Sequence, residues 1–119
     1  MNAMHHAAVV AAFVLGCSDD GTGPSCGSGG TATAVRVCDD LFAPSSSPIT
    51  AGATVEWSWG GQRPHNVTFE DGQGSSTTQT SGTHERTFST SGTFRYRCTI
   101  HSTGFTPGPG QMVGTVTAQ

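Results

Sequence analysis

A cysteine and a histidine three residues apart, Cys98 and His101, are the side chains of this sequence that most clearly indicate chemistry. Met112 follows after a loop rich in proline and glycine, and a second histidine, His65, lies far upstream. One thiolate, two imidazoles and a weakly bound thioether are the ligand set of a blue copper electron-transfer site. Sulfur ligands favour Cu(I) and imidazoles suit Cu(II), so this set lets the metal change oxidation state with little change of shape.

The elements that must position these residues are indicated by a regular alternation of apolar and polar side chains, which is typical of half-buried β-strands. Turn residues separate the alternating runs, and no helical periodicity of useful length follows residue 17. Residues 71–82 are rich in Gly, Ser, Thr and Gln and predict a long connection. The sequence therefore predicts an all-β sandwich with strands at residues 32–38, 54–59, 65–70, 85–89, 92–98 and 112–118.

Strand parity places two of the candidate ligands on the inner face of this sandwich. Side chains at positions i, i+2 and i+4 of a strand share one face of the sheet. His65 has the parity of Val67 and Phe69, and Cys98 has the parity of Tyr96. Both side chains are therefore expected to point inward at strand ends, where a thiol and an imidazole that converge can share a metal.

The residues beside these two ligands also have expected roles. His101 lies in a loop, so it should be the more exposed imidazole and the natural exit for an electron. Asn66 directly follows His65 and is expected to help fix the ligand loops. Met112 is the expected axial ligand, with Gln111 as the alternative because an amide oxygen can occupy the axial position.

Composition limits the classes of function that the chain can have. Its 119 residues and net charge of −3 fit one small domain with an appendage. Lysine is absent and only five arginines are present, so the chain has no electrostatic footprint for nucleic acid. A copper enzyme would need further histidine clusters, whereas two of the five histidines lie at positions 5 and 6. The composition therefore indicates a protein that is not an enzyme.

A continuous apolar run of nine residues, Ala7–Leu15, lies near the start of the chain. It is too short to span a bilayer and suits the apolar region of an export signal. It ends in Val14-Leu15-Gly16-Cys17, which resembles the lipobox of bacterial lipoproteins, with Cys17 as the residue that would carry the lipid. A plain secretory signal and a short buried helix are the alternatives.

These features predict three parts of the chain. A lipoprotein signal peptide covers residues 1–16, a flexible tether with the lipidated Cys17 covers residues 17–31, and the folded domain covers residues 32–119. The tether is rich in Ser, Gly and Asp and would reach about 20 Å as a random coil. The chain is therefore expected to be exported to the cell envelope, in the periplasm or at the cell surface, and anchored to a membrane.

The four cysteines divide among three expected roles. If Cys17 carries a lipid and Cys98 binds metal, Cys26 and Cys38 remain. In an oxidising compartment these two would pair in a disulfide that pins the end of the tether to the first strand, and two free thiols are the alternative. The sequence has no Cys-x-x-Cys motif, so thioredoxin chemistry and a four-cysteine zinc site have no support.

Four segments together resemble the small blue copper proteins, the plastocyanin/azurin-like cupredoxins, and more closely their plastocyanin branch. They read AGATVEW at 51–57, PHNV at 64–67, GTFRYRCTIH at 92–101 and MVGTV at 112–116. The resemblance covers residues 34–118. It implies a Greek-key β-sandwich that holds one type 1 copper ion in one-electron transfer and turns over no substrate.

The resemblance also sharpens the expected ligands and partners. Members of the family usually place the methionine only a few residues after the second histidine, whereas ten residues separate His101 from Met112 here. Pro107 and Pro109 stiffen this loop and its glycines permit the turns that would return Met112 to the site. A monomer with an unidentified redox protein as donor and another as acceptor is expected. Copper storage or delivery with the same ligands is the alternative.

Overall fold

The computed structural model describes Cys26 and residues 30–119. The expected signal peptide at residues 1–16, the expected lipidation site Cys17 and most of the expected tether lie outside the described residues. Within the described part of the chain, no helix is long and apolar enough to cross a membrane.

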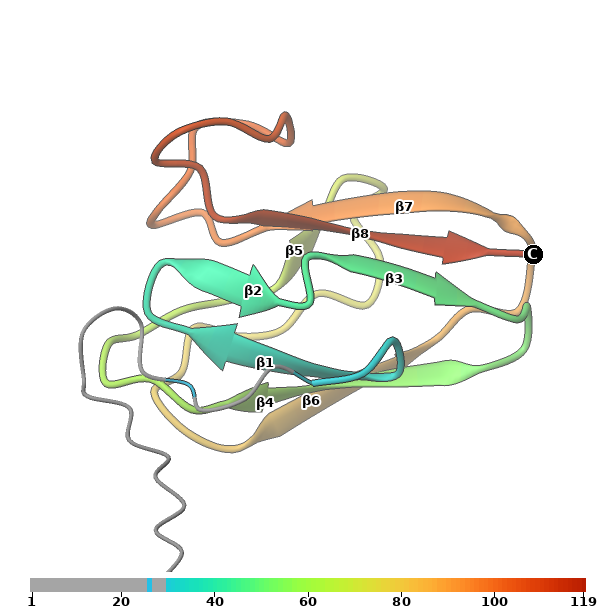
Figure 1. Ribbon diagram of the computed structural model, residues 1–119, viewed down its shortest axis with the longest axis horizontal. Coiled ribbons are helices and arrows are strands. Elements are labelled where there is room, and N and C mark those ends of the chain that lie inside the picture. Colours follow the sequence, from blue (N-terminus) through green and yellow to red (C-terminus); the bar gives the residue numbers. More distant parts are fainter. Residues whose placement is uncertain (1–25, 27–29) are drawn as a thin grey trace, which may run out of the picture.

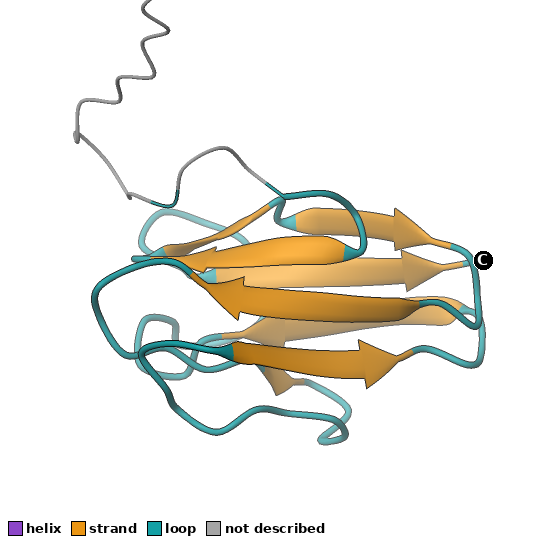
Figure 2. Cartoon of the chain, turned by 90° about the horizontal axis from the view of Figure 1, so that it is seen from below, coloured by secondary structure: helices purple, strands orange, loops and turns teal. Residues whose placement is uncertain are grey.

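Two four-stranded sheets pack face to face in the described part of the chain (Figures 1 and 2). The first has the order β2 (Leu41–Ala43), β1 (Ala34–Cys38), β4 (Thr54–Trp59) and β6 (Thr83–Thr87). The second has the order β3 (Ser46–Ile49), β8 (Val113–Ala118), β7 (Gly92–Arg97) and β5 (Thr68–Phe69). Strand β1 runs parallel to β4, and β3 runs parallel to β8. The predicted all-β sandwich is confirmed.

The core between the sheets follows the alternation in the sequence. In β4, Val55, Trp57 and Trp59 are buried while the residues between them face outward. The Trp57 ring packs edge-on against Phe69 and Tyr96 of the other sheet, with ring centroids 5.5 and 5.3 Å apart. Such aromatic pairs contribute about 0.5–1.5 kcal/mol beyond the area they bury. This packing fixes the two sheets relative to each other, and with them the loops at the sheet ends.

The predicted strand at residues 65–70 is largely wrong. Only Thr68–Phe69 pairs with β7, and His65 forms a single bridge to Gln79. The reason is that serine side chains satisfy the backbone here: Val67 N–H donates to Ser76 Oγ and Phe69 N–H to Ser75 Oγ, both at 2.9 Å. The inward direction of the side chains predicted from parity survives, because His65, Val67 and Phe69 are all buried.

Two short strands were not expected from the sequence. Strand β2 pairs with β1 across the two-residue turn Asp39-Asp40, in which Asp40 takes a left-handed backbone with φ of 73° that aspartate tolerates better than most residues. The chain then passes through a cis Ala43–Pro44 peptide into β3. Both strands are too short to show a clear alternation.

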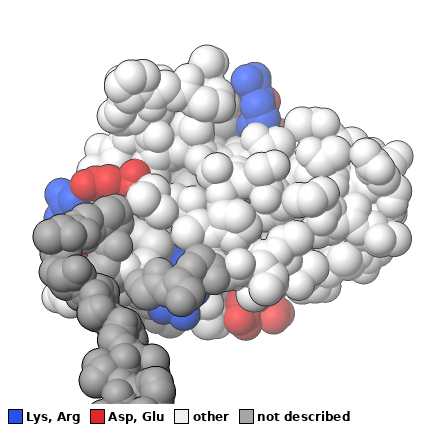
Figure 3. All heavy atoms as spheres, viewed as in Figure 1, with Lys and Arg blue, Asp and Glu red and all other residues white. Residues whose placement is uncertain are grey.

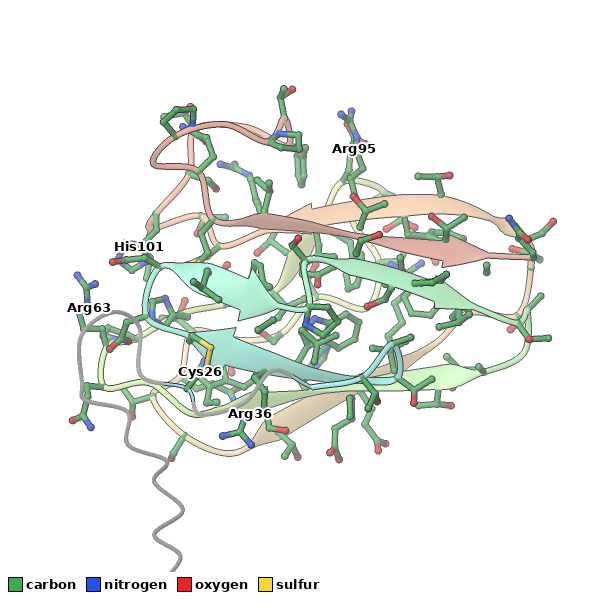
Figure 4. All side chains as sticks on the ribbon, in the orientation of Figure 1. Cys26, Arg36, Arg63, Arg95 and His101 are labelled. Carbon is green, nitrogen blue, oxygen red and sulfur yellow. A yellow bond between two sulfur atoms is a disulfide. The ribbon has the colours of Figure 1, made fainter. Side chains whose placement is uncertain are left out.

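The structure joins Cys26 and Cys38 in a disulfide, with the two Cα atoms 5.1 Å apart. The pairing of these two cysteines that the sequence favoured is therefore present, and the alternative of two free thiols is not. Figure 4 shows this bond at the end of β1. It ties the chain before the first strand to the residue directly preceding Asp39.

Candidate metal centre

Three predicted ligands, Cys98, His101 and Met112, are held together by backbone hydrogen bonds where β7 ends and β8 begins. Cys98 N–H donates to the Met112 carbonyl at 3.0 Å, and Met112 N–H donates to the His101 carbonyl at 3.1 Å. His101 N–H in turn donates to the Cys98 carbonyl at 3.2 Å. The loop at 102–111 therefore does return Met112 to the strand end, although it is long. Figure 1 shows this loop at the end of the sandwich opposite the C-terminus.

His65 joins this group from the connection between β4 and β5. Its Nδ1 lies 3.1 Å from His101 Nδ1 and 3.8 Å from Cys98 Sγ, and Cys98 Sγ lies 3.5 Å from His101 Nδ1. These three atoms form a triangle with one sulfur and two imidazole nitrogens, so a single metal ion among them can contact all three. A trigonal His₂Cys arrangement is the donor set of a blue copper site.

The centre is sealed on all but one side. Cys98 and His65 have no exposed surface, and Met112 is 1% exposed. The His101 side chain is 22% exposed, at the loop end of the sandwich where Figure 4 labels it. A metal held here would be shielded from water and reachable only along the His101 imidazole.

The Asp39 carboxylate orients the buried imidazole, and it is not among the site residues expected from the sequence. Its Oδ1 lies 2.9 Å from His65 Nε2 and accepts a hydrogen bond from it, which leaves Nδ1 free for a metal. Partial burial works against ionisation, but this hydrogen bond and those from the Gln62 and Arg63 N–H groups lower the pKa of Asp39 to about 2. The only clue in the sequence is an acidic residue directly after a strand.

Further hydrogen bonds fix the backbone of His65. Its N–H and carbonyl both pair with Gln79 at 3.0 Å, and Trp59 Nε1–H donates to the same carbonyl at 3.1 Å. The segment 71–82 was expected to be a connection without a strand, and apart from this bridge it is one. It nevertheless holds the backbone of a proposed ligand through Gln79.

His101 lies in a different environment. Its Nε2 is 3.8 Å from Asp40 Oδ1, which is too far for a hydrogen bond. Burial and the neighbouring His65 lower the pKa of His101 below its usual 6.5. An open pocket beside the ring is lined by residues that include Asp40, Ile100 and Thr103. The prediction that His101 is the more exposed imidazole is confirmed.

Asn66 bridges the two segments that carry the ligands. Its Nδ2 donates to Thr99 Oγ1 at 2.9 Å and to Thr78 Oγ1 at 3.0 Å. Its Oδ1 accepts from Thr99 N–H at 3.1 Å and from Thr68 Oγ1 at 2.8 Å. The side chain is buried, and both its amide nitrogen and its oxygen make two hydrogen bonds. It therefore links the His65 segment to the Cys98–His101 turn, in keeping with the role expected from the sequence.

The two candidates for the axial position differ in what their side chains do. Gln111 Oε1 accepts a hydrogen bond from Thr103 N–H at 2.9 Å and so braces the loop. The Met112 side chain is buried in the same apolar cluster as Cys98. This difference favours Met112 as the axial ligand.

No protein-family model and no curated protein matches the chain. Among solved structures, oxidised plastocyanin from Dryopteris crassirhizoma matches with 23% identity, a TM-score of 0.61, and coverage of 72% of this chain and 99% of that one. Amicyanin from Paracoccus versutus matches with 28% identity and a TM-score of 0.57, over 73% of this chain and 80% of that one.

A Cu-containing nitrite reductase from Thermus scotoductus also matches, with 21% identity and a TM-score of 0.59. The match covers 73% of this chain but only 22% of the reductase. The likeness therefore concerns one part of that longer enzyme. Together with the sheet order and the position of the ligand loop, these matches show that the chain has a cupredoxin fold of the plastocyanin kind.

Proposed function

We propose that this chain is a type 1 (blue) copper protein that carries one electron at a time. The observation that carries the proposal is the triangle of Cys98 Sγ, His65 Nδ1 and His101 Nδ1, whose sides measure 3.1 to 3.8 Å. Copper would supply the change between Cu(I) and Cu(II). The likeness to plastocyanin and amicyanin supports the same assignment.

The protein contributes a fixed ligand geometry. Cys98, His65 and His101 would hold the copper, with Met112 as the fourth ligand. Backbone hydrogen bonds among Cys98, His101 and Met112 hold three of these residues independently of any metal. Because the ligands are positioned by the fold, little rearrangement should accompany the change of oxidation state. Their burial keeps water away and tunes the potential of the site.

His101 is the proposed route for electrons. It alone of the four proposed ligands has a substantially exposed side chain, and Ile100 beside it is 51% exposed. Figure 3 shows that the visible face carries few charged atoms, and the exposed Asp40 carboxylate near the site is paired with Arg63. A redox protein that docks by shape and apolar contact over this edge suits such a surface. We propose separate redox proteins as donor and acceptor, and a monomeric carrier.

Spectroscopy and voltammetry on the purified chain test this function. One equivalent of Cu(II) should give an intense blue colour, and the copper should cycle reversibly by one electron. Cys98→Ser should abolish the colour, while His84→Gln, which changes a histidine outside the triangle, should leave it intact. Colourless binding by the unaltered chain would favour copper storage or delivery instead. A chain with Cys98→Ser that stays blue would refute the site.

We further propose export and lipid anchoring in the bacterial cell envelope. The support is the apolar run Ala7–Leu15 followed by Gly16-Cys17 in the sequence, together with a disulfide, which persists in oxidising compartments. The mature protein should begin at Cys17 and carry a lipid there. Mass spectrometry of protein from membranes checks this, and an unmodified Cys17 or an intact N-terminal segment would contradict it.

A further inference from the structure

We propose that Asp39 is a positioning residue of the metal centre: its carboxylate fixes His65 as an Nδ1 ligand and thereby lowers the midpoint potential. This inference rests on the proposed copper function. It concerns a residue outside the ligand set, at the turn between β1 and β2.

The contact between the two side chains is short and shielded. Asp39 Oδ1 lies 2.9 Å from His65 Nε2, and the His65 side chain has no exposed surface. The Asp39 side chain is only 17% exposed. A buried Nε2–H has no water to replace this acceptor, so the carboxylate determines both which nitrogen carries the proton and how the ring is turned.

The carboxylate is itself held in place. Both of its oxygens accept from Gln62 N–H at 3.0 Å, and Oδ1 accepts from Arg63 N–H at 2.9 Å. The loop reaches it only because residue 61 is glycine: a Cβ at Gly61 would lie 2.8 Å from both the Asp39 backbone nitrogen and its Cγ. The carboxylate therefore cannot turn away from His65 without breaking these backbone contacts.

The backbone of Asp39 is fixed from the other side as well. Cys38, the residue before it, is bonded to Cys26, and Gly60 N–H donates to the Val37 carbonyl at 2.9 Å. The parallel pairing of β1 and β4 thus brings the turn after β1 against the loop after β4. Asp39 and His65 are held together by the fold, before any metal binds.

The chemical consequence follows from the hydrogen bond. An imidazole whose N–H is donated to a carboxylate is a stronger donor through its other nitrogen, and it binds a metal more tightly. Cu(II) gains more than Cu(I) from a stronger nitrogen donor and from a nearby negative charge. The oxidised state is favoured and the midpoint potential falls.

Asp40 provides a matched control in the same turn. Its Oδ1 lies 3.8 Å from His101 Nε2, too far for a hydrogen bond, and its side chain is 55% exposed. Asp40→Asn removes the same formal charge from the neighbourhood of the metal without removing a hydrogen bond to a ligand. The difference between the two variants measures what a charged acceptor bonded to His65 adds beyond a nearby negative charge.

The test compares Asp39→Asn, Asp40→Asn and the unaltered full chain, each loaded with copper. Asp39→Asn should lower Cu(II) affinity by about 10–100-fold. If Cu(II) loses tenfold more affinity than Cu(I), the midpoint potential rises by about 59 mV. Asp40→Asn should give a clearly smaller rise. Equal shifts in the two variants, or no shift in Asp39→Asn, would overturn the positioning role.

A second measurement needs no variant and covers the case in which Asp39→Asn does not fold. In the Cu(I) form of the unaltered chain, nitrogen-15 NMR should find a His65 Nε2–H that exchanges slowly with water and a His101 Nε2–H that exchanges fast. Equal, fast exchange would overturn the proposal. If the unaltered chain takes up no copper as a blue site, the proposed function fails. If it turns blue but these tests fail, only the role of Asp39 does.

Discussion

The two imidazoles of the centre have opposite surroundings. His65 is fully buried, its backbone pairs with Gln79 on both sides, and its ring nitrogen Nε2 is bound to Asp39. His101 lies in a loop, its side chain is 22% exposed, and its Nε2 has no hydrogen bond to Asp40 at 3.8 Å. One side of the centre is therefore built for fixed geometry and the other for access, and the proposed carrier needs both.

Replacing each imidazole in turn should give the largest difference between the buried and the exposed side of the centre. His65→Gly and His101→Gly should each abolish the blue colour of the copper-loaded chain. Free imidazole should restore it in His101→Gly, because the vacated position opens to solvent, and not in His65→Gly, where the position is enclosed. Visible absorption with and without added imidazole checks this.

Both outcomes bear on the same asymmetry. Rescue of His65→Gly as complete as that of His101→Gly would show that the buried side is open to small molecules. Failure to rescue His101→Gly, in a chain that still folds, would show that the loop collapses without its imidazole.

The second largest effect should come from removing the disulfide, which supports the buried side of the centre, where His65 lies. The bond closes a loop with a sequence separation of 12 residues, and Cys26→Ala with Cys38→Ala should lower the free energy of unfolding by about 2–3 kcal/mol. Urea denaturation measures the difference. Because Asp39 follows Cys38, copper affinity should fall as well. Unchanged stability and affinity would mean that the β1–β2 turn is held without the bond.

Asn66 joins the two sides, so its loss should affect both. Asn66→Ala removes four hydrogen bonds of a buried side chain and leaves the Thr99 N–H without its acceptor. We expect a loss of about 1–3 kcal/mol in the free energy of unfolding. Thr78→Ala removes only one of the four bonds and should have a smaller effect. Equal losses in the two variants would remove Asn66 from its linking role.

The smallest expected effect is on the pH dependence of stability in the metal-free chain. His101 on the exposed side and Asp39 on the buried side should lose their contributions to stability in different pH ranges. The lowered pKa of His101 means that its contribution to stability is complete above its usual pKa of 6.5 and is lost as the pH falls through the lowered value. Asp39 contributes fully above 3.8, and its contribution is lost between 3.8 and about 2.

Denaturation curves at several pH values check this order. His101→Gln should remove the loss in the upper range and Asp39→Asn that in the lower range. A single loss that neither substitution changes would show that other groups control the acid response.

Most of the core could be predicted from the sequence because local alternation determines which face of a strand is buried. Val55, Trp57 and Trp59 lie inward as their spacing predicts. The same rule placed His65 and Cys98 inside, although His65 proved to lie outside any strand. Parity survived there because the segment stays extended while Ser75 and Ser76 replace the expected strand partners.

What could not be predicted depends on contacts between segments distant in sequence. Asp39 and His65 are 26 residues apart, and only the parallel pairing of β1 with β4 brings them together. Strands β2 and β3 have three and four residues, too few for a visible period. A local pattern can predict which way a side chain faces, but a hydrogen bond between two loops requires knowledge of the sheet order.

X-ray absorption at the copper edge, recorded for both oxidation states of the loaded chain, identifies the atoms that bind the copper. We expect one thiolate sulfur and two imidazole nitrogens around copper in each state, with little change in their distances. The ligands are the buried Cys98, the enclosed His65 and the accessible His101. A copper shell without the short sulfur bond, or one that gains or loses a ligand on reduction, would contradict it.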